Sequence, residues 1–363
     1  MSILSHQFPP NLKGIYDESM ANQLANAQSA VASLNQLKRV LQNADLLMHP
    51  ILSKEAESSS QLEGTQASIE DAYKIDIIEQ SKEERNEAIE IRNYERAMYQ
   101  GLGILEKLPL DKFTIREVHK ILLLGARGQS KHPGEFRKGD VWIGQKGTKK
   151  GESRYVPPDA SQVDPLIEKM VNYINNSGTT NPLIVCGIIH HRFEAIHPFE
   201  DGNGRTGRLL ISLYLIKKGV LTKPILYPSG YFEKNRKAYM DALSKVDCKE
   251  DWYNWLMFFL TGIEKQAQLS LNVGLKIDDM FKNSKELIKK EKANLGLIEV
   301  LEFMFKKYFV TAPLVHRETN IPLTSCKRYL EKLSEKGIIV DLGIHNRHRV
   351  YANTKLLSIL RNI

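Results

Sequence analysis

The sequence predicts a mainly α-helical protein with one β-hairpin and a small C-terminal domain that adds two strands. Apolar residues recur at helical spacing through most of the 363 residues, and β-like segments are confined to residues 131–158 and 338–352. A hydrophobic content of 42% and a charged content of 26% are ordinary for a soluble globular protein.

The first half of the chain is expected to be helical. Residues 15–45 and 65–105 carry apolar side chains three and four positions apart, and another helix follows a short connection between residues 105 and 124. The polar segment SSSQLEGTQAS between the first two stretches reads at first as a turn.

Residues 131–158 are rich in Gly, Lys and Pro, and their β-like pieces are 141–143 and 154–156. We expect a hairpin there, with the segment GQKGTKKGES as a mobile tip. Helices then resume in four segments, at residues 162–176, 181–195, 232–246 and 251–267. Between the second and the third, HPFEDGNGRTGR leads into the apolar helix LLISLYLIKKG, which is expected to stop at Gly219.

The C-terminal quarter has its own pattern. Three helices and two strands are expected there, at residues 297–308, 312–318, 323–336, 338–341 and 349–352. Three helices followed by a two-stranded wing are typical of a winged helix-turn-helix domain. The preceding residues 281–296 are polar and basic, and they fit either a linker or an exposed helix.

The net charge of +8 comes from this part of the chain. Of the 51 Lys and Arg residues 16 lie in residues 281–363, against 8 of the 43 Asp and Glu residues, so the rest is neutral. A local basic excess indicates a polyanion partner for that part only. Lys327, Arg328 and Arg347 suit contacts to nucleic-acid phosphates, whereas Glu331 argues against them. DNA binding therefore stays open beside protein docking or dimerisation.

Cysteine usage and hydropathy exclude several classes of protein. Cys186, Cys248 and Cys326 are far apart and form no C-x-x-C pair, so neither a disulfide framework nor a structural zinc site is expected. A reducing cytoplasm is the expected compartment. The sequence shows no secretory signal and no apolar stretch long enough to span a bilayer, so no membrane association is expected.

The chemistry is concentrated in residues 197–208, HPFEDGNGRTGR. Gly202 and Gly204 let the backbone approach a ligand closely, and the loop opens into a helix N-terminus, whose free N–H groups favour phosphate. Arg205 and Arg208 lie three residues apart and can clamp phosphate oxygens from one side.

Two further side chains complete this candidate phosphate site. The Asp201 carboxylate can hold magnesium against the phosphates, and His197 can take a proton from an incoming hydroxyl. The segment is not a known phosphate loop, because it lacks G-x-x-x-x-G-K-[ST] and no strand precedes it. His190 and His191 lack the spacing of a zinc site with His197, and we interpret both as structural.

The same string resembles the signature of the Fic (filamentation induced by cAMP) family, H-P-F-x-[DE]-G-N-G-R-x-x-R, at every fixed position. Residues 134–157 resemble the family's flap, and FEKNRKAYMDAL and DWYNWLMFFL resemble its downstream helices. The likeness covers roughly residues 50–270 and implies an all-helical core with one β-hairpin.

The resemblance implies a protein adenylyltransferase, which moves AMP from ATP to a Ser, Thr or Tyr hydroxyl of a target protein, itself included, and releases pyrophosphate. His197 would be the general base and Asp201 the magnesium ligand. Arg205 would hold the phosphates and Arg208 the γ-phosphate. Phe199 would anchor the loop in the core.

The resemblance also implies a larger set of residues around the nucleotide. The Asn203 side chain would cradle the α- and β-phosphates together with the loop backbone, and Tyr239 would flank the adenine, although a plain core tyrosine fits equally well. The full ATP-binding set is Glu63, His197, Asp201, Gly202, Asn203, Gly204, Arg205, Thr206, Gly207, Arg208 and Tyr239. In the flap, two residues would lie over the target chain, Ile143 and Gly144.

A second motif lies upstream, where residues 59–64 (SSQLEG) resemble the family's inhibitory helix, [ST]-x-x-x-E-[GN]. In such proteins this glutamate, here Glu63, pairs with the second arginine, here Arg208, which then cannot hold the γ-phosphate. Other readings stay open. Glu63 can instead orient water to remove AMP from a modified protein, the enzyme can transfer another phosphate-containing group, or the fold can sense nucleotide in a DNA-binding regulator.

Four regions follow from these assignments. We expect an N-terminal helical region at 1–104 with the inhibitory helix at about 55–68, a Fic catalytic core at 105–270, a basic linker or helix at 271–296, and a winged helix domain at 297–363. The expected ligands are ATP as substrate and magnesium. The expected partner is a protein with an acceptor hydroxyl, and DNA and a second copy of the chain remain open.

Overall fold

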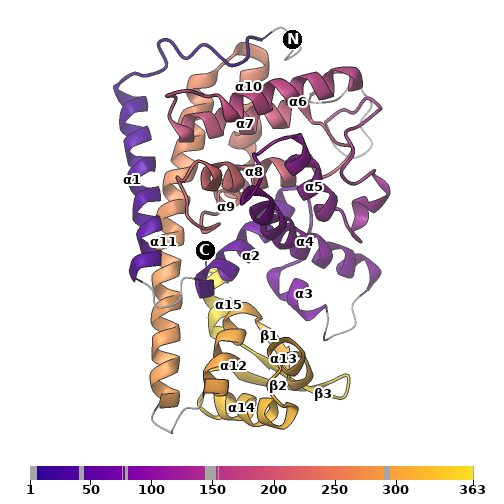
Figure 1. Cartoon of the computed structure of the whole chain (residues 1–363), viewed down its shortest axis with the longest axis vertical. Helices are drawn as coiled ribbons and strands as arrows, with labels where there is room; N and C mark the ends of the chain where they lie inside the picture. The colour runs from indigo at the N-terminus through magenta and orange to yellow at the C-terminus, as the bar shows by residue number, and fades with distance from the viewer. Residues whose placement is uncertain are drawn as a thin grey trace.

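The computed structural model describes residues 6–40, 45–75, 77, 81–143, 153, 155–289 and 295–362. Two long helices lie side by side along one edge, a helical core lies beside them, and the C-terminal domain lies at one end of the molecule (Figure 1). The mainly helical fold predicted from the sequence is confirmed. No helix in these ranges is both long and apolar enough to cross a membrane.

The two long helices are α1 (Glu18–Val40) and α11 (Trp252–Lys289), which pack along each other. Helix α11 runs well past the predicted end at residue 267. Buried side chains continue at helical spacing as far as Ile288, because the segment packs against α1 and then against the C-terminal domain. Of the two alternatives expected for residues 271–296, a linker or a helix, the structure has helix as far as Lys289.

Helix α2 (Asp45–Leu62) corrects the interpretation of the serine-rich segment as a turn, because the serines form its last turns and are buried. The helix ends at Leu62, and Glu63 and Gly64 lie in the turn after it, so the inhibitory helix does not reach residue 68. The predicted stretch 65–105 is divided into α3 (Ile69–Lys74) and α4 (Lys82–Leu105), each begun by a Ser capping box.

The helical core surrounds α7 (Pro182–Ile196) and α8 (Asn203–Lys217), whose residues are nearly all buried. The segment HPFEDG joins the two, so the packing of both helices fixes it. Gly219 follows α8 with φ +70°, as expected of a helix stop. The elements around this pair are α5 (Lys112–Leu122), the short 3-10 helix Arg127–Ser130, α6 (Ala160–Asn175), α9 (Ser229–Lys234) and α10 (Arg236–Lys249).

Only the base of the predicted hairpin lies within the described residues. Within the described residues it consists of one antiparallel bridge between Ile143 and Tyr155, with no longer strand on either side. Gly144, the tip segment and residue 154 lie outside the described residues.

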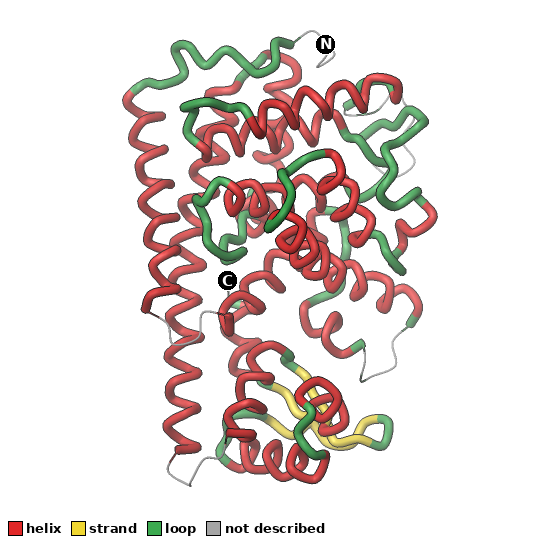
Figure 2. Tube along the Cα trace, viewed as in Figure 1, coloured by secondary structure: helices red, strands yellow, loops and turns green. Residues whose placement is uncertain are grey.

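The C-terminal domain contains the predicted helices and strands in the predicted order, plus β1 and α15, which the sequence did not indicate. Its three antiparallel strands are ordered β1-β3-β2 and form the sheet shown in yellow in Figure 2. DNA binding by this domain stays a prediction. The elements are α12 (Leu295–Lys306), β1 (Phe309–Thr311), α13 (Ala312–Thr319), α14 (Leu323–Glu335), β2 (Val340–His345), β3 (His348–Ala352) and α15 (Thr354–Arg361).

A buried polar network joins this domain to α2. The Tyr308 hydroxyl donates to Ser53 Oγ at 3.0 Å, and Ser53 Oγ donates to Glu95 Oε1 at 2.5 Å. The Tyr73 hydroxyl donates to the same carboxylate at 2.8 Å. Because burial raises the pKa of Glu95, this carboxyl depends on its hydroxyl donors. The C-terminal domain is thereby attached to the helix that ends at Glu63.

Replacing Glu95 with Ala should lower the free energy of unfolding by about 3 kcal/mol, because two buried hydroxyls lose their acceptor. Tyr308→Phe removes one donor only and should cost about 1 kcal/mol. Urea unfolding of both variants measures the difference. Equal stability of Glu95→Ala and the parent protein would contradict a structural role for the network.

Candidate active site

His197 lies at the C-terminal end of α7, with its backbone in the left-handed region at φ 50°. This conformation is costly for a residue other than glycine, and neighbouring bonds hold it in place. Arg137, which is 4% exposed, donates from Nε to the His197 carbonyl at 2.9 Å. Its backbone N–H donates to the Pro198 carbonyl at 2.9 Å. The start of the flap therefore fixes the catalytic loop.

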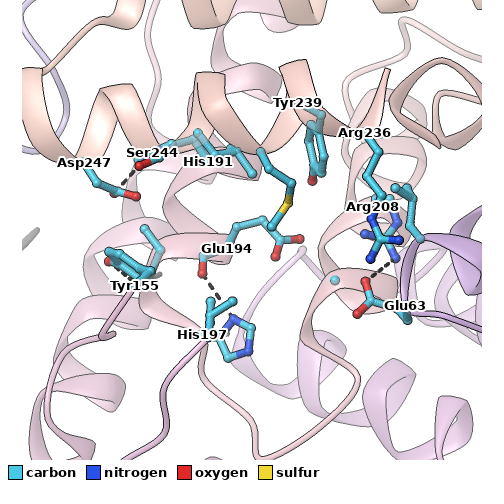
Figure 3. Close-up of a pocket in the computed structure, with 16 residues that line it drawn as sticks. Glu63, Tyr155, His191, Glu194, His197, Arg208, Arg236, Tyr239, Ser244 and Asp247 are labelled. Carbon is cyan, nitrogen blue, oxygen red and sulfur yellow. Dashed lines mark hydrogen bonds and ion pairs between the residues drawn. The ribbon is translucent and has the colours of Figure 1, made fainter. Parts of the chain in front are cut away.

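The imidazole of His197 has one nitrogen engaged. Nδ1 lies 3.3 Å from the Glu194 carbonyl, which can only accept, so Nδ1 carries the proton and Nε2 keeps its lone pair (Figure 3). Burial lowers the pKa of His197 to about 4, although Glu63 opposes the shift. The ring is therefore neutral at pH 7, which is the form that accepts a proton.

Asn203 and Phe199 brace the loop from inside. The Asn203 amide accepts from the Phe199 N–H and donates to the Phe199 carbonyl, both at 2.8 Å. These two bonds hold the amide against the loop backbone, and the expected contact of Asn203 with phosphate stays a prediction. Phe199 is fully buried, as expected of an anchor.

His119 was missed by the sequence interpretation. Its ring stacks on Phe199 with the centroids 3.6 Å apart, accepts at Nδ1 from the Gly134 N–H and donates from Nε2 to the Asp201 carbonyl. Burial lowers its pKa to about 4, which fits the neutral form that these two bonds require. A single histidine within an amphipathic helix has no local signature, so only the fold connects it to the loop.

The N-terminus of α8 offers backbone donors. Gly202 precedes it with φ 76° and has no side chain, and no other described side chain caps this turn. A β-carbon at position 204 would lie 2.1 Å from Glu63 Oε1 and 2.8 Å from Arg208 Nη1, so a larger residue there would displace the ends of these two side chains. The first N–H groups of the helix have no side-chain cap, and the Glu63 carboxylate beside Arg208 occupies the space next to them, so an anion already lies where a phosphate could bind.

Glu63 and Arg208 meet at this helix end, as predicted. Arg208 Nη2 donates to Glu63 Oε1 at 2.8 Å, and Arg208 also donates to the Ser59 hydroxyl and carbonyl. The Arg208 side chain is 2% exposed and that of Glu63 35%. Burial opposes ionisation of Glu63, but the Arg208 guanidinium outweighs it and lowers the pKa of this carboxyl. Both groups are charged at neutral pH.

Arg205 has a different environment. Its side chain is 1% exposed, with Nη1 3.2 Å from Glu90 Oε2 and Nη2 3.7 Å from Asp201 Oδ1. It contacts two carboxylates and is not among the residues that line the cavity, and its expected contact with phosphate stays a prediction. Thr206 likewise turns inward, where its hydroxyl donates to the Gly202 carbonyl at 2.8 Å.

A cavity of about 320 Å³ opens beside the loop. Glu63, Gly204 and Arg208 lie at one end, and Tyr155, His191, Ser244 and Asp247 lie at the other (Figure 3). His197, Glu194 and Tyr239 line the middle. Of the predicted residues, those that line the cavity are Glu63, Ile143, His197, Gly204, Arg208 and Tyr239, and those beside it in the loop and first helical turn are Asp201, Gly202, Asn203, Arg205, Thr206 and Gly207.

The two neighbouring histidines differ. His190 is structural as predicted, because Nδ1 faces the Gly207 carbonyl and Nε2 accepts from the Tyr239 hydroxyl at 2.8 Å. His191 lies 3.3 Å from Asp247 and lines the cavity, so its interpretation as purely structural is incomplete.

Asp201 fits a magnesium ion held mainly by phosphates. Its side chain is 35% exposed, and Oδ1 accepts from the Gly202 N–H at 2.7 Å. No cluster of three or more potential metal ligands occurs within the described ranges. Magnesium often takes only one or two carboxylates and completes its shell with phosphate and water, so this single donor suits it.

Comparisons with known families agree with the site. The model of the Fic/DOC family matches residues 109–215, and that of the Fic/DOC family N-terminal region matches residues 21–103. The chain belongs to the Fic/DOC family. The first match contains the whole loop and the second contains Glu63, so both halves of the Glu63–Arg208 pair lie in regions typical of Fic proteins.

Named relatives are similar over part of their length. A "Probable protein adenylyltransferase" of Aquifex aeolicus is 33% identical over 115 residues, which cover 32% of this chain and 31% of that protein. The "Protein adenylyltransferase Fic" of Drosophila virilis is 28% identical over 185 residues, covering 50% and 34%. That of Drosophila mojavensis is 24% identical over 277 residues, covering 74% and 51%. The chain thus spans between a third and a half of these relatives.

Solved structures show the same fold. A Fic family protein from Desulfovibrio desulfuricans has a TM-score of 0.59 at 17% identity, covering 96% of this chain and 98% of that one. A Fic domain protein from Bacteroides thetaiotaomicron has a TM-score of 0.55 at 19% identity, covering 70% and 97%. The Fic fold inferred from the sequence is confirmed.

His197 should titrate with a pKa of about 4, because its ring is buried. Glu63→Gln should lower this pKa further, since the Glu63 charge stabilises the imidazolium. A pH titration of the histidine resonances by NMR, assigned with His197→Ala, measures both values. A His197 pKa near that of a free histidine would contradict the buried, neutral base.

Proposed function

We propose that the chain is a protein adenylyltransferase that transfers AMP from ATP to a hydroxyl of a target protein. One observation carries the proposal: a neutral His197, with Nε2 free to accept, lines a cavity whose end is a helix N-terminus next to Arg208. A proton acceptor beside an anion site suits the attack of a hydroxyl on a phosphorus atom. The names of the relatives support the same activity.

In this reaction the target hydroxyl oxygen attacks the α-phosphorus while its proton passes to His197 Nε2. The new oxygen–phosphorus bond forms as the bond from the α-phosphorus to the bridging oxygen breaks, and pyrophosphate leaves with the bonding electrons. The N–H groups of the first α8 turn and the Arg208 guanidinium stabilise the charge that develops on the phosphate oxygens. Ile143 places the flap beside the incoming target chain.

Asp201 would hold the magnesium ion, which offsets negative charge on the phosphates when bound. His119 fixes the Asp201 backbone, and Arg205 lies close to one carboxylate oxygen. Together they fix the position of Asp201 in the loop.

The geometry supports self-inhibition by Glu63. Its Oε1 accepts from Arg208 Nη2 at 2.8 Å, and Arg208 carries the guanidinium that a γ-phosphate would need. The same carboxylate lies over Gly204 at the N-terminus of α8. Charge-assisted bonds of this kind are strong, so ATP has to compete with an intramolecular partner. ATP would then bind with its α-phosphorus out of line with the target hydroxyl.

Removal of AMP from a modified protein is a second candidate. Glu63 and His197 line the same cavity, and a partly exposed carboxylate there can orient a water molecule toward the phosphorus. Release of AMP from a pre-modified protein, dependent on Glu63, would distinguish this direction.

His197→Ala should abolish transfer while ATP binding stays within about twofold, because the proton moves only in the transition state. Asp201→Ala is the matched comparison and should weaken ATP binding only when magnesium is present. Autoradiography with α-labelled ATP measures transfer, and calorimetry measures binding. Labelling by His197→Ala at the parent rate would contradict the proposed base.

A further inference from the structure

Glu194 is an acidic group of the cavity for which the reaction above has no role. It lies in the last turn of α7, three residues before His197, and its side chain lines the cavity between the two ends (Figure 3). Its Oε1 is buried and has no hydrogen-bond partner in the described part of the chain. A β-carbon at Gly207 would lie only 2.4 Å from this oxygen, so the carboxyl packs directly over the α8 backbone.

The hydrogen-bond donors around Glu194 are engaged with other residues. Arg208, from α8, already donates to Ser59 and Glu63. The Tyr239 hydroxyl, from α10, donates to His190. A buried polar atom that lacks a partner indicates either a neutral group or an absent ligand.

The charges that face Glu194 come from four elements. Arg208 on α8 favours its ionised form, while Glu63 at the end of α2 opposes it. Two further cationic or titratable side chains line the cavity near it, Arg236 on α10 and His197 on its own helix. Beyond them, His191 and Asp247 lie at the far end.

We propose that Glu194 is the proton-carrying residue of the nucleotide site: it is neutral when a nucleoside triphosphate is bound beside Arg208, and binding takes up one proton from solvent. The proposal rests on the proposed function for the identity of the ligand. A triphosphate brings several negative charges to the cavity, and an ionised Glu194 next to Glu63 would repel them. The proton neutralises the carboxylate, and no covalent bond changes.

The direction of the pH effect follows from burial and charge. Burial raises the pKa of Glu194 to about 7, Arg208 lowers it in part and Glu63 raises it. The negative charge of bound phosphates should raise the pKa of Glu194 further. Glu194 therefore keeps its proton to a higher pH in the complex than in the free protein. ATP affinity should therefore fall as pH rises above about 7, by up to about tenfold per pH unit. His197, with a pKa of about 4, stays neutral throughout this range.

The test is calorimetry of ATP with excess magnesium across neutral pH, in two buffers of different ionisation enthalpy. The parent protein should bind about tenfold more weakly near pH 8.5 than near pH 6.5 and should take up protons on binding. Glu194→Gln, which mimics the protonated acid, should bind without proton uptake and with little pH dependence. At the higher pH it should bind more tightly than the parent protein.

Glu95→Gln is the matched control, because it neutralises another buried glutamate outside the cavity, and it should keep the parent pH dependence. A flat pH profile in the parent protein would overturn the proposal. So would a pH dependence that persists in Glu194→Gln, because the proton would then belong to another group. Absence of ATP binding at every pH would instead overturn the proposed function, and this inference with it.

Discussion

The ion pair between Glu63 and Arg208 is the contact on which the rest of the site depends. A guanidinium that is 2% exposed needs an anionic partner, and the fold supplies one from a helix 145 residues away in the sequence. That helix, α2, is fixed along its length. Glu55 accepts from the Ser229 N–H and the Tyr94 hydroxyl, Ser59 binds Arg208 itself, and Ser53 joins the network of the C-terminal domain.

The remaining features of the site line the same cavity. Low exposure keeps His197 neutral, and its Nδ1–H bond to the Glu194 carbonyl leaves Nε2 for the reaction. Oε1 of the Glu194 carboxyl has no hydrogen-bond partner within the described ranges. The cavity thus brings together a neutral base, a carboxylate paired with Arg208, and a second carboxyl group whose Oε1 has no hydrogen-bond partner among the described residues.

The sequence predicted those parts of the site that one continuous segment encodes. His197, Gly204 and Arg208 were found because glycines, a helix start and charged residues occur together in the loop, and Glu63 was found through a family resemblance. His119, Arg137 and Glu194 were missed because each acts through backbone groups or neighbours that only the tertiary fold provides. The bracing of the Phe199 backbone by the Asn203 amide was not foreseen for the same reason. Helix α11 is longer than predicted, and the serines at the end of α2 are helical and buried although the segment is polar. In both cases packing against other elements overrides the local polarity of the sequence.

The most direct test of the account is the initial rate of AMP transfer by Glu63→Gly, by the parent protein and by the double variant that also carries Arg208→Ala. If the pair holds the site inactive, Glu63→Gly should be faster than the parent by at least about tenfold, and the double variant should lose the gain because the effect acts through Arg208. Glu57→Gly, which removes another acidic side chain of α2, controls for loosening of that helix. Equal rates for Glu63→Gly and the parent protein, or a gain that survives the loss of Arg208, would contradict the account.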